Sequence, residues 1–134
     1  MLGFQYQGAP QVRMTKTGLV LESLETLSVS GGATGVDPDV EKATTVVCIT
    51  GNTDNVTGTL ADGKYTGQIK YIAVAKTTVG FQYHLTVSNL APTPGPVELR
   101  LGLNDPAAAG SSGVSLLWHE DRWIPLSDIQ ALLD

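Results

Sequence analysis

The chain has 134 residues and a formal net charge of −5, with 42% apolar and 16% charged residues. This composition fits one globular domain with an ordinary core and excludes an intrinsically disordered chain. The eight lysines and arginines form no basic run, so we expect no direct nucleic-acid partner.

Residues 1–18 are expected to form an extended N-terminal arm. They show no regular apolar period, and glycine and proline interrupt them repeatedly. Their apolar content is high for a free tail, so we expect the arm to contact a partner. The residues expected to make this contact are Leu2, Phe4, Tyr6, Val12 and Met14.

Residues 19–126 are expected to form one β domain. Apolar residues at even spacing predict a first strand over residues 19–29, with Ser23 as the place for a break, and good helix formers there keep a helix as the competing prediction. A loop rich in glycine and proline follows. Apolar runs and strict alternation then predict strands at residues 44–50, 68–75, 81–87, 97–103, 114–118 and 122–126.

The last two of these strands are predicted to form a hairpin that makes Trp118 and Trp123 cross-strand neighbours. A capping-box pattern at Ser127 and Gln130 predicts a short helix over residues 127–134. Eight residues are not helical alone, so its apolar residues must dock on the domain. The predicted fold is all-β: a compact β-sandwich or β-barrel of about seven strands, with the arm and this helix.

The stretch GTLADGK, residues 58–64, almost spells a phosphate-binding loop. Such a loop needs Ser or Thr after its lysine, where this chain has Tyr65. It must also run into a helix, whereas the sequence continues as the strand-like TGQIKYIAVA. We expect instead a strand, a turn with Gly63 at positive φ, and a second strand that begins after a bend at Gly67.

The reactive side chains form no catalytic pattern. His84 lies on the polar face of a predicted strand, and His119 lies at a predicted hairpin tip. The acidic residues Asp37, Asp39 and Glu41 lack the glycine and the closing glutamate of a calcium loop. We expect no enzyme activity and no catalytic, cofactor or metal site.

The single cysteine, Cys48, lies within the apolar run TTVVCIT and is expected to be a buried thiol of a protein made in a reducing compartment. The N-terminal residues lack a signal-peptide pattern. No segment approaches the ~18 apolar residues that span a bilayer, so we expect no membrane partner.

Four segments of the C-terminal half follow one another as LADGKYTGQIKYIAV, YHLTVSNL, VELRLGL and VSLLWHEDRWIPL. An Asp-Gly turn leads into Gly-Gln-x-Lys-x-Ile, two strands follow, and a final hairpin carries Leu-x-Trp and Trp-x-x-Leu. Over residues 60–126 this order resembles a β module of virion structural proteins, found in capsid decoration and tail-fibre proteins of bacteriophages. The chain departs from that pattern at residues 104–113, where the module has a shorter Gly-Asp turn.

The resemblance implies a non-enzymatic β module, often trimeric, on the outside of a virus particle. Because the chain is short and has no shaft repeats, we expect a capsid decoration (cement) protein, made in the host cytoplasm. Its partners would be sister copies in a homotrimer and the major capsid protein, which the N-terminal arm would contact. Residues expected in the subunit contact or the core are Ile69, Ile72, Val74, Trp118 and Trp123.

The alternative interpretation is a tail-fibre or spike component that binds a glycan or receptor on the host surface. Flat aromatic side chains stack on sugars, and the two tryptophans, Trp118 and Trp123, together with the four tyrosines could form such a platform.

Overall fold

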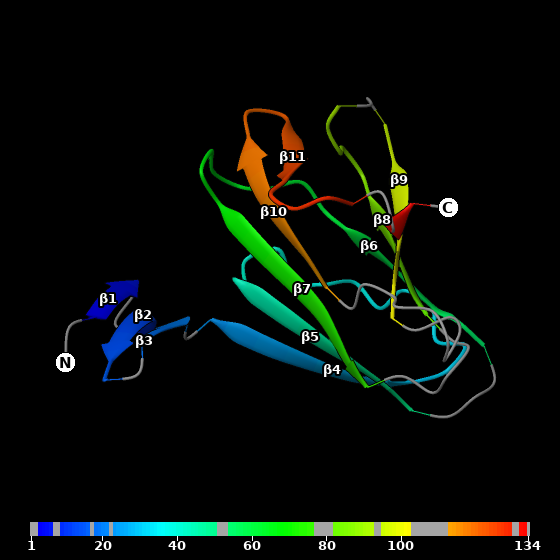
Figure 1. Cartoon of the computed structure of the whole chain (residues 1–134), viewed down its shortest axis with the longest axis horizontal. Helices are drawn as coiled ribbons and strands as arrows, with labels where there is room; N and C mark the ends of the chain where they lie inside the picture. Colours follow the sequence, from blue (N-terminus) through cyan, green and yellow to red (C-terminus); the bar gives the residue numbers. More distant parts are fainter. Residues whose placement is uncertain are drawn as a thin grey trace.

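A computed structural model of the chain describes residues 3–6, 9–16, 18–21, 23–50, 54–76, 82–92, 95–102, 113–129 and 132–133. The described residues form three β-sheets and contain no α-helix, which confirms the predicted all-β class (Figure 1). Side chains are described from residue 23 onward within these ranges, and for Lys16.

The N-terminal residues form a small antiparallel sheet of strands β1 (Gly3–Tyr6), β2 (Ala9–Thr15) and β3 (Gly18–Leu21). Two residues separate β1 from β2, and two separate β2 from β3, which is the commonest spacing for a hairpin. The extended arm predicted for residues 1–18 is therefore not confirmed. Of the residues that suggested an arm, Gly3 and Gly18 begin β1 and β3, and Pro10 is the second residue of β2.

The largest sheet has the order β11-β10-β7-β5-β4. Strands β4, β5 and β7 run parallel, whereas β7, β10 and β11 are antiparallel. The strand bounds are Leu24–Ser30 for β4, Thr44–Thr50 for β5, Ile69–Lys76 for β7, Gly113–His119 for β10 and Arg122–Pro125 for β11. The strand predicted over residues 19–29 is divided between β3 and β4, with the break beside Ser23.

A second mixed sheet has the order β6-β8-β9, with β6 parallel to β8 and β8 antiparallel to β9. Its strands are β6 (Val56–Leu60), β8 (Tyr83–Val87) and β9 (Val97–Leu101). Together the two mixed sheets contain eight strands where about seven were predicted. The additional one is β6, a strand that was expected before the turn at Asp62 but not counted among the seven.

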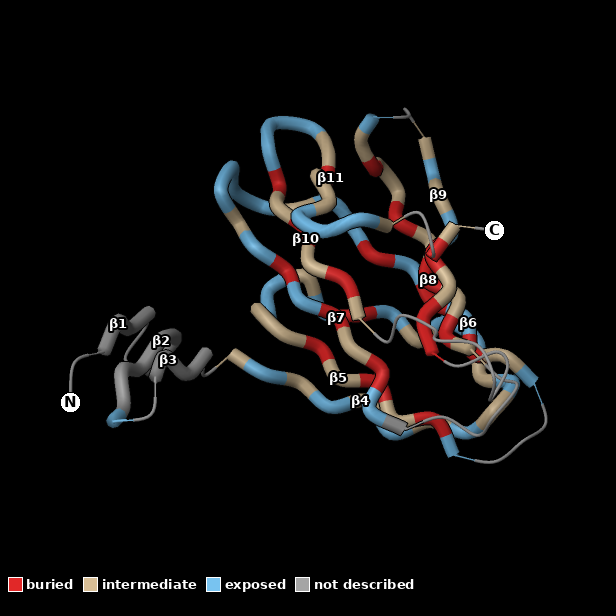
Figure 2. Tube along the Cα trace, viewed as in Figure 1, coloured by how far each residue is buried: buried red, intermediate tan, exposed pale blue. Residues whose placement is uncertain are grey.

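The core lies between these two sheets, where the buried positions of both meet (Figure 2). Strict alternation puts every second residue of β8 and β10 into this core, as the period of two requires. Leu132 is buried there, and Ile129 and Leu133 pack beside it. The predicted C-terminal helix is not confirmed, since the described residues make one turn in which Leu132 N and Leu133 N donate to Ile129 O, but these apolar residues do dock on the domain.

The predicted tryptophan pair is confirmed. Trp118 and Trp123 are directly opposite in the β10–β11 hairpin, with ring centroids 5.2 Å apart in an edge-to-face arrangement. The prediction of positive φ at Gly63 is wrong. Gly63 lacks a side chain for another reason: a Cβ there would overlap the Trp118 ring. The expected bend at Gly67 is present, with φ at 95°.

Candidate functional site

Uncharged side chains gather on part of the outer face of the five-stranded sheet, where two large apolar residues are exposed. We define this outer face by Ile69, Tyr71 and Ala73 of β7 and their cross-strand neighbours Leu117, Ser115 and Gly113 of β10. Ile69 and Tyr71 are each 39% exposed, and none of the six residues carries a charge. A sheet face that meets water normally carries polar side chains, so this composition indicates a contact surface.

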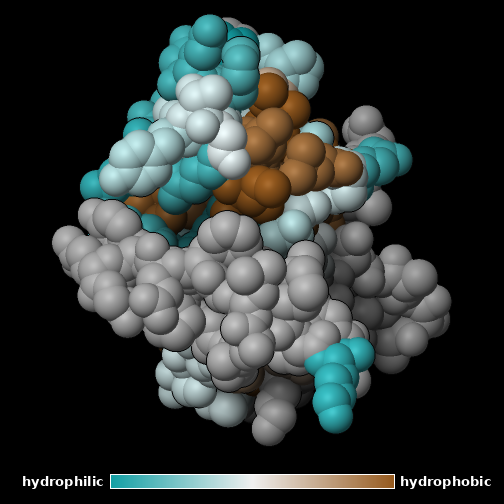
Figure 3. All heavy atoms as spheres, turned by 90° about the vertical axis from the view of Figure 1, so that its left-hand side faces the viewer, coloured by the Kyte–Doolittle hydropathy of each residue, from teal (hydrophilic) through white to brown (hydrophobic). Residues whose placement is uncertain are grey.

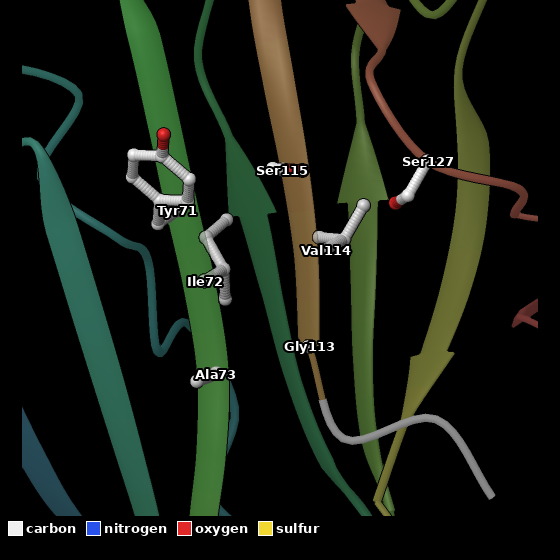
Figure 4. Close-up of a pocket in the computed structure, with 7 residues that line it drawn as sticks. All are labelled: Tyr71, Ile72, Ala73, Gly113, Val114, Ser115 and Ser127. Carbon is white, nitrogen blue, oxygen red and sulfur yellow. The ribbon is translucent and has the colours of Figure 1, made fainter.

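Figure 3 views the molecule from the side of this sheet and shows apolar residues gathered in one patch beside polar ones. A shallow depression of about 270 Å³ lies between β7, β10 and Ser127, which follows β11 (Figure 4). Its lining includes Tyr71 and Ser115 of the outer face and the core-facing Ile72 and Val114. With no carboxylate, imidazole or cation in this lining, the depression suits an apolar contact.

The structure divides the predicted contact residues between the core and the surface. Ile72, Val74, Trp118 and Trp123 are buried in the core, and Ile69 alone of that set lies on the outer face. Of the arm residues, Leu2 lies outside the described residues. Phe4, Tyr6, Val12 and Met14 lie on β1 and β2, but their side chains are not among those described, so their contact with a capsid stays a prediction.

A buried lysine network, which sequence reasoning missed, lies beneath the loop that joins β4 to β5. Lys70 is fully buried, and its Nζ donates to Asp39 O at 2.9 Å, Lys42 O at 2.8 Å and Thr45 Oγ1 at 2.6 Å. The Glu25 carboxylate accepts from Thr45 Oγ1 at 2.5 Å and lies 4.0 Å from Nζ. The sequence did indicate an inward position for Lys70, because residues 70, 72 and 74 lie on the same face of strand β7 and Ile72 and Val74 belong to the core.

Burial lowers the pKa of Lys70 from 10.5 to about 8, because the charged ammonium loses its water; the charges of Glu25 and Asp39 partly offset this. A lysine with a lowered pKa can mark a reactive site. Here two of the three partners, Asp39 O and Lys42 O, belong to the loop and hold it on the sheet, and the lysine side chain has no exposed surface. The network therefore ties the loop to the fold and is out of reach of a substrate.

The same loop crosses close over β6 at Gly58. The Tyr83 hydroxyl donates to Val36 O at 2.5 Å, and a Cβ at Gly58 would overlap both of these groups. Burial raises the pKa of Tyr83 well above its usual range, so the hydroxyl keeps the proton that this bond requires. Gly58 is thus the close-approach position that lets the loop cover β6.

Replacing Gly58 with alanine is expected to lower the free energy of unfolding by about 2 kcal/mol, because the loop must move off β6 to admit the methyl group. Urea denaturation would measure the change. Thr59→Ala, at an exposed position of the same strand, is the control and should change stability by less than about 0.5 kcal/mol. Equal stabilities for the two variants would show that the close approach is not there.

The two histidines and the acidic residues do not gather in one cluster. His84 Nδ1 lies 3.4 Å from Glu98 Oε1 on the β6-β8-β9 sheet, whereas His119 is exposed at the end of β10. The Asp37 carboxylate accepts a hydrogen bond from Thr59 N, so it holds the loop between β4 and β5 against β6. Among the described residues, no three His, Cys, Asp or Glu side chains lie close enough together to hold a metal ion.

The stretch that resembles a phosphate-binding loop connects β6 to β7, as the prediction of strand, turn and strand required. Its backbone amides do not begin a helix, so it lacks the arrangement that binds phosphate. Within the described ranges, no helix has the length and apolar character needed to cross a membrane.

No protein-family model, curated protein or solved structure matches this chain.

Proposed function

We propose that this chain is a virion structural protein, a capsid decoration protein that binds the outer surface of an assembled shell as a trimer. The observation that carries the proposal is the uncharged apolar outer face, with Ile69 and Tyr71 each 39% exposed on an acidic β domain. Copies that each carry a net charge of −5 repel one another, so an uncharged face is where they can meet. The chain has no catalytic role in this proposal.

The described strands β4–β11 form a β-sandwich in this proposal, and the outer face of its larger sheet is buried between sister copies. The N-terminal residues, rich in apolar side chains, then contact the major capsid protein on the virion surface.

A decoration protein of this kind stabilises the shell by mass action, because it binds the assembled lattice and not the free capsid subunits. Three linked copies bind multivalently, so weak individual contacts give a strong total attachment, about 10²–10⁴-fold above that of a single copy. A monomeric variant should therefore lose capsid binding even when its own contact residues are intact.

The test uses capsids purified from a virus that lacks this gene, with the recombinant chain added back. We expect the chain to bind along the shell and to raise the temperature at which the capsid releases its DNA. Tyr71→Lys on the outer face should weaken binding by at least about 100-fold through loss of the trimer. Thr59→Lys, an exposed position on the other sheet, is the matched control and should bind normally.

Mass spectrometry of purified virions provides the outcome that would overturn the proposal. A chain missing from virions, or present only at the copy number of a tail fibre, is incompatible with a decoration role. The glycan-binding alternative drew partly on the tryptophans, which are not accessible to a sugar, since Trp118 is 6% and Trp123 0% exposed.

A further inference from the structure

Strand β4 forms an open edge of the five-stranded sheet. It pairs with β5 on one side, over seven consecutive residues in unbroken parallel register. On its other side no described strand pairs with it. Natural proteins protect such an edge with lysine, proline, a bulge, an inward-pointing charge or a covering loop. Among the described residues β4 has one of these devices, Glu25, whose carboxylate points inward to Thr45 and Lys70.

The hydrogen-bond pattern identifies which backbone groups of β4 face outward. Ser23 O accepts from Thr44 N, and Gly31 N donates to Thr50 O, so the odd-numbered residues face β5. In a parallel pair the alternate residues direct their N–H and C=O groups to the opposite side. The backbone groups of Leu24, Thr26 and Ser28 therefore point to the open edge.

The parallel edge strand β6 makes an instructive contrast. Its outward N–H groups, those of Thr57 and Thr59, donate to Ala33 O and to the Asp37 carboxylate of the covering loop. The edge at β11 is covered in the same way, because Trp123 N donates to Asn89 O and Trp123 O accepts from Ala91 N. The fold thus covers two of its edges with its own loops and leaves the long edge at β4 uncovered within the described residues.

The N-terminal strands β1–β3 form a sheet that is separate from the rest of the domain. The N-terminal sheet β1–β3 pairs with neither of the other two sheets. It lies beyond the end of β4 and not along its edge (Figure 1). The chain is anchored to the large sheet from Ser23 onward, because Ser23 Oγ and O accept from Ala43 N and Thr44 N, whereas β3 ends at Leu21.

We propose that the β4 edge of each copy is paired by an edge strand of the N-terminal sheet of a second copy. The inference rests on the trimer of the proposed function and adds a main-chain contact to the one that the outer face makes between copies. Each copy then offers one edge and one sheet, a head-to-tail contact that closes into a ring of three. Main-chain hydrogen bonds to Leu24, Thr26 and Ser28 supply the attachment, as in strand addition elsewhere.

Ser28→Pro tests the contact, because it removes an outward N–H without breaking a bond to β5, and proline is tolerated at an open edge. Light scattering on the full chain, of 14.1 kDa per copy, should give a threefold mass for the wild type and for the control Ser28→Thr. Ser28→Pro should have the mass of one copy, and so should a chain lacking residues 1–21. Circular dichroism would verify that each variant keeps its β structure.

Amide hydrogen exchange provides a second readout that needs no substitution on β4. The amides of Thr26 and Ser28 should exchange at least about 100-fold more slowly in the wild type than in the chain lacking residues 1–21. Rapid exchange of both amides in a wild-type trimer, or a trimeric Ser28→Pro, would overturn the inference and leave the trimer standing. A monomeric wild type would refute both, while the virion composition tests the decoration role separately.

Discussion

Replacing Trp123 with alanine is expected to lower the free energy of unfolding by about 3–5 kcal/mol, the largest stability effect of any substitution considered for this fold. The side chain is 0% exposed and stacks edge-to-face on Trp118. Its Nε1 donates to Ala61 O at 2.9 Å, so the substitution removes core volume and leaves a carbonyl without its donor. Chemical denaturation with guanidinium chloride would measure the loss.

Trp123→Phe is the matched control, because it keeps an aromatic ring in the core and removes the Nε1 donor. It should cost roughly half as much as the alanine variant, since most of the contact area is retained. A loss below about 1 kcal/mol for Trp123→Ala would contradict the position of Trp123 in the core and would reopen the interpretation in which the tryptophans bind a partner.

The alternating segments were the most predictable part of this fold. In YHLTV and VELRL the apolar residues recur at every second position, and one buried face in a strand requires that spacing. The hairpin followed from the same rule, because its two strands are adjacent in the chain. Each of these predictions depended on neighbouring residues alone.

The sheet order could not be predicted in that way. Strands β4, β5 and β7 run parallel because the chain crosses to the other sheet and returns between β5 and β7, and no local pattern specifies such a return. The capping-box pattern at Ser127 failed for a related reason. A segment this short takes its conformation from packing on the core, where Leu132 is buried, and not from helix propensity.

The candidate site was partly visible in the sequence. Ile69, Tyr71 and Ala73 alternate with core residues, so both faces of β7 could be recognised as apolar. Which face meets the second sheet depends on partners that are distant in sequence, so the exposed face could not be chosen. Lys70 was overlooked because a lysine on an inward position is expected only when buried partners exist, and Asp39 and Lys42 reach it from the loop between β4 and β5.

The stability contributed by Lys70 is expected to increase as the pH rises from about 8 to 10. The folded chain has a Lys70 pKa of about 8, whereas the unfolded chain keeps the ordinary value of 10.5. Between these values the unfolded chain binds the proton that the folded chain has released. Stability rises with pH wherever the unfolded state binds more protons, so the sign of the slope is positive.

The full effect corresponds to roughly 3 kcal/mol, since one pKa unit is worth about 1.4 kcal/mol and the lysine moves from 10.5 to about 8. Lys70→Met is the matched variant, because methionine fills a similar volume and does not titrate. The difference in unfolding free energy between wild type and Lys70→Met, measured by urea denaturation at pH 7, 8, 9 and 10, isolates the lysine. Other groups, including Tyr83, contribute equally to both proteins and cancel.

We expect this difference to be constant up to about pH 8 and then to increase in favour of the wild type, because the neutral amine no longer loses hydration on burial and still donates to the loop carbonyls. The value at pH 7 carries no prediction of its own, since replacing a buried ion by an apolar group of similar volume can be neutral or stabilising. The slope decides. A difference that stays flat or falls between pH 8 and 10 would mean that Lys70 is hydrated in the folded chain and that the loop over β6 is held by its other contacts.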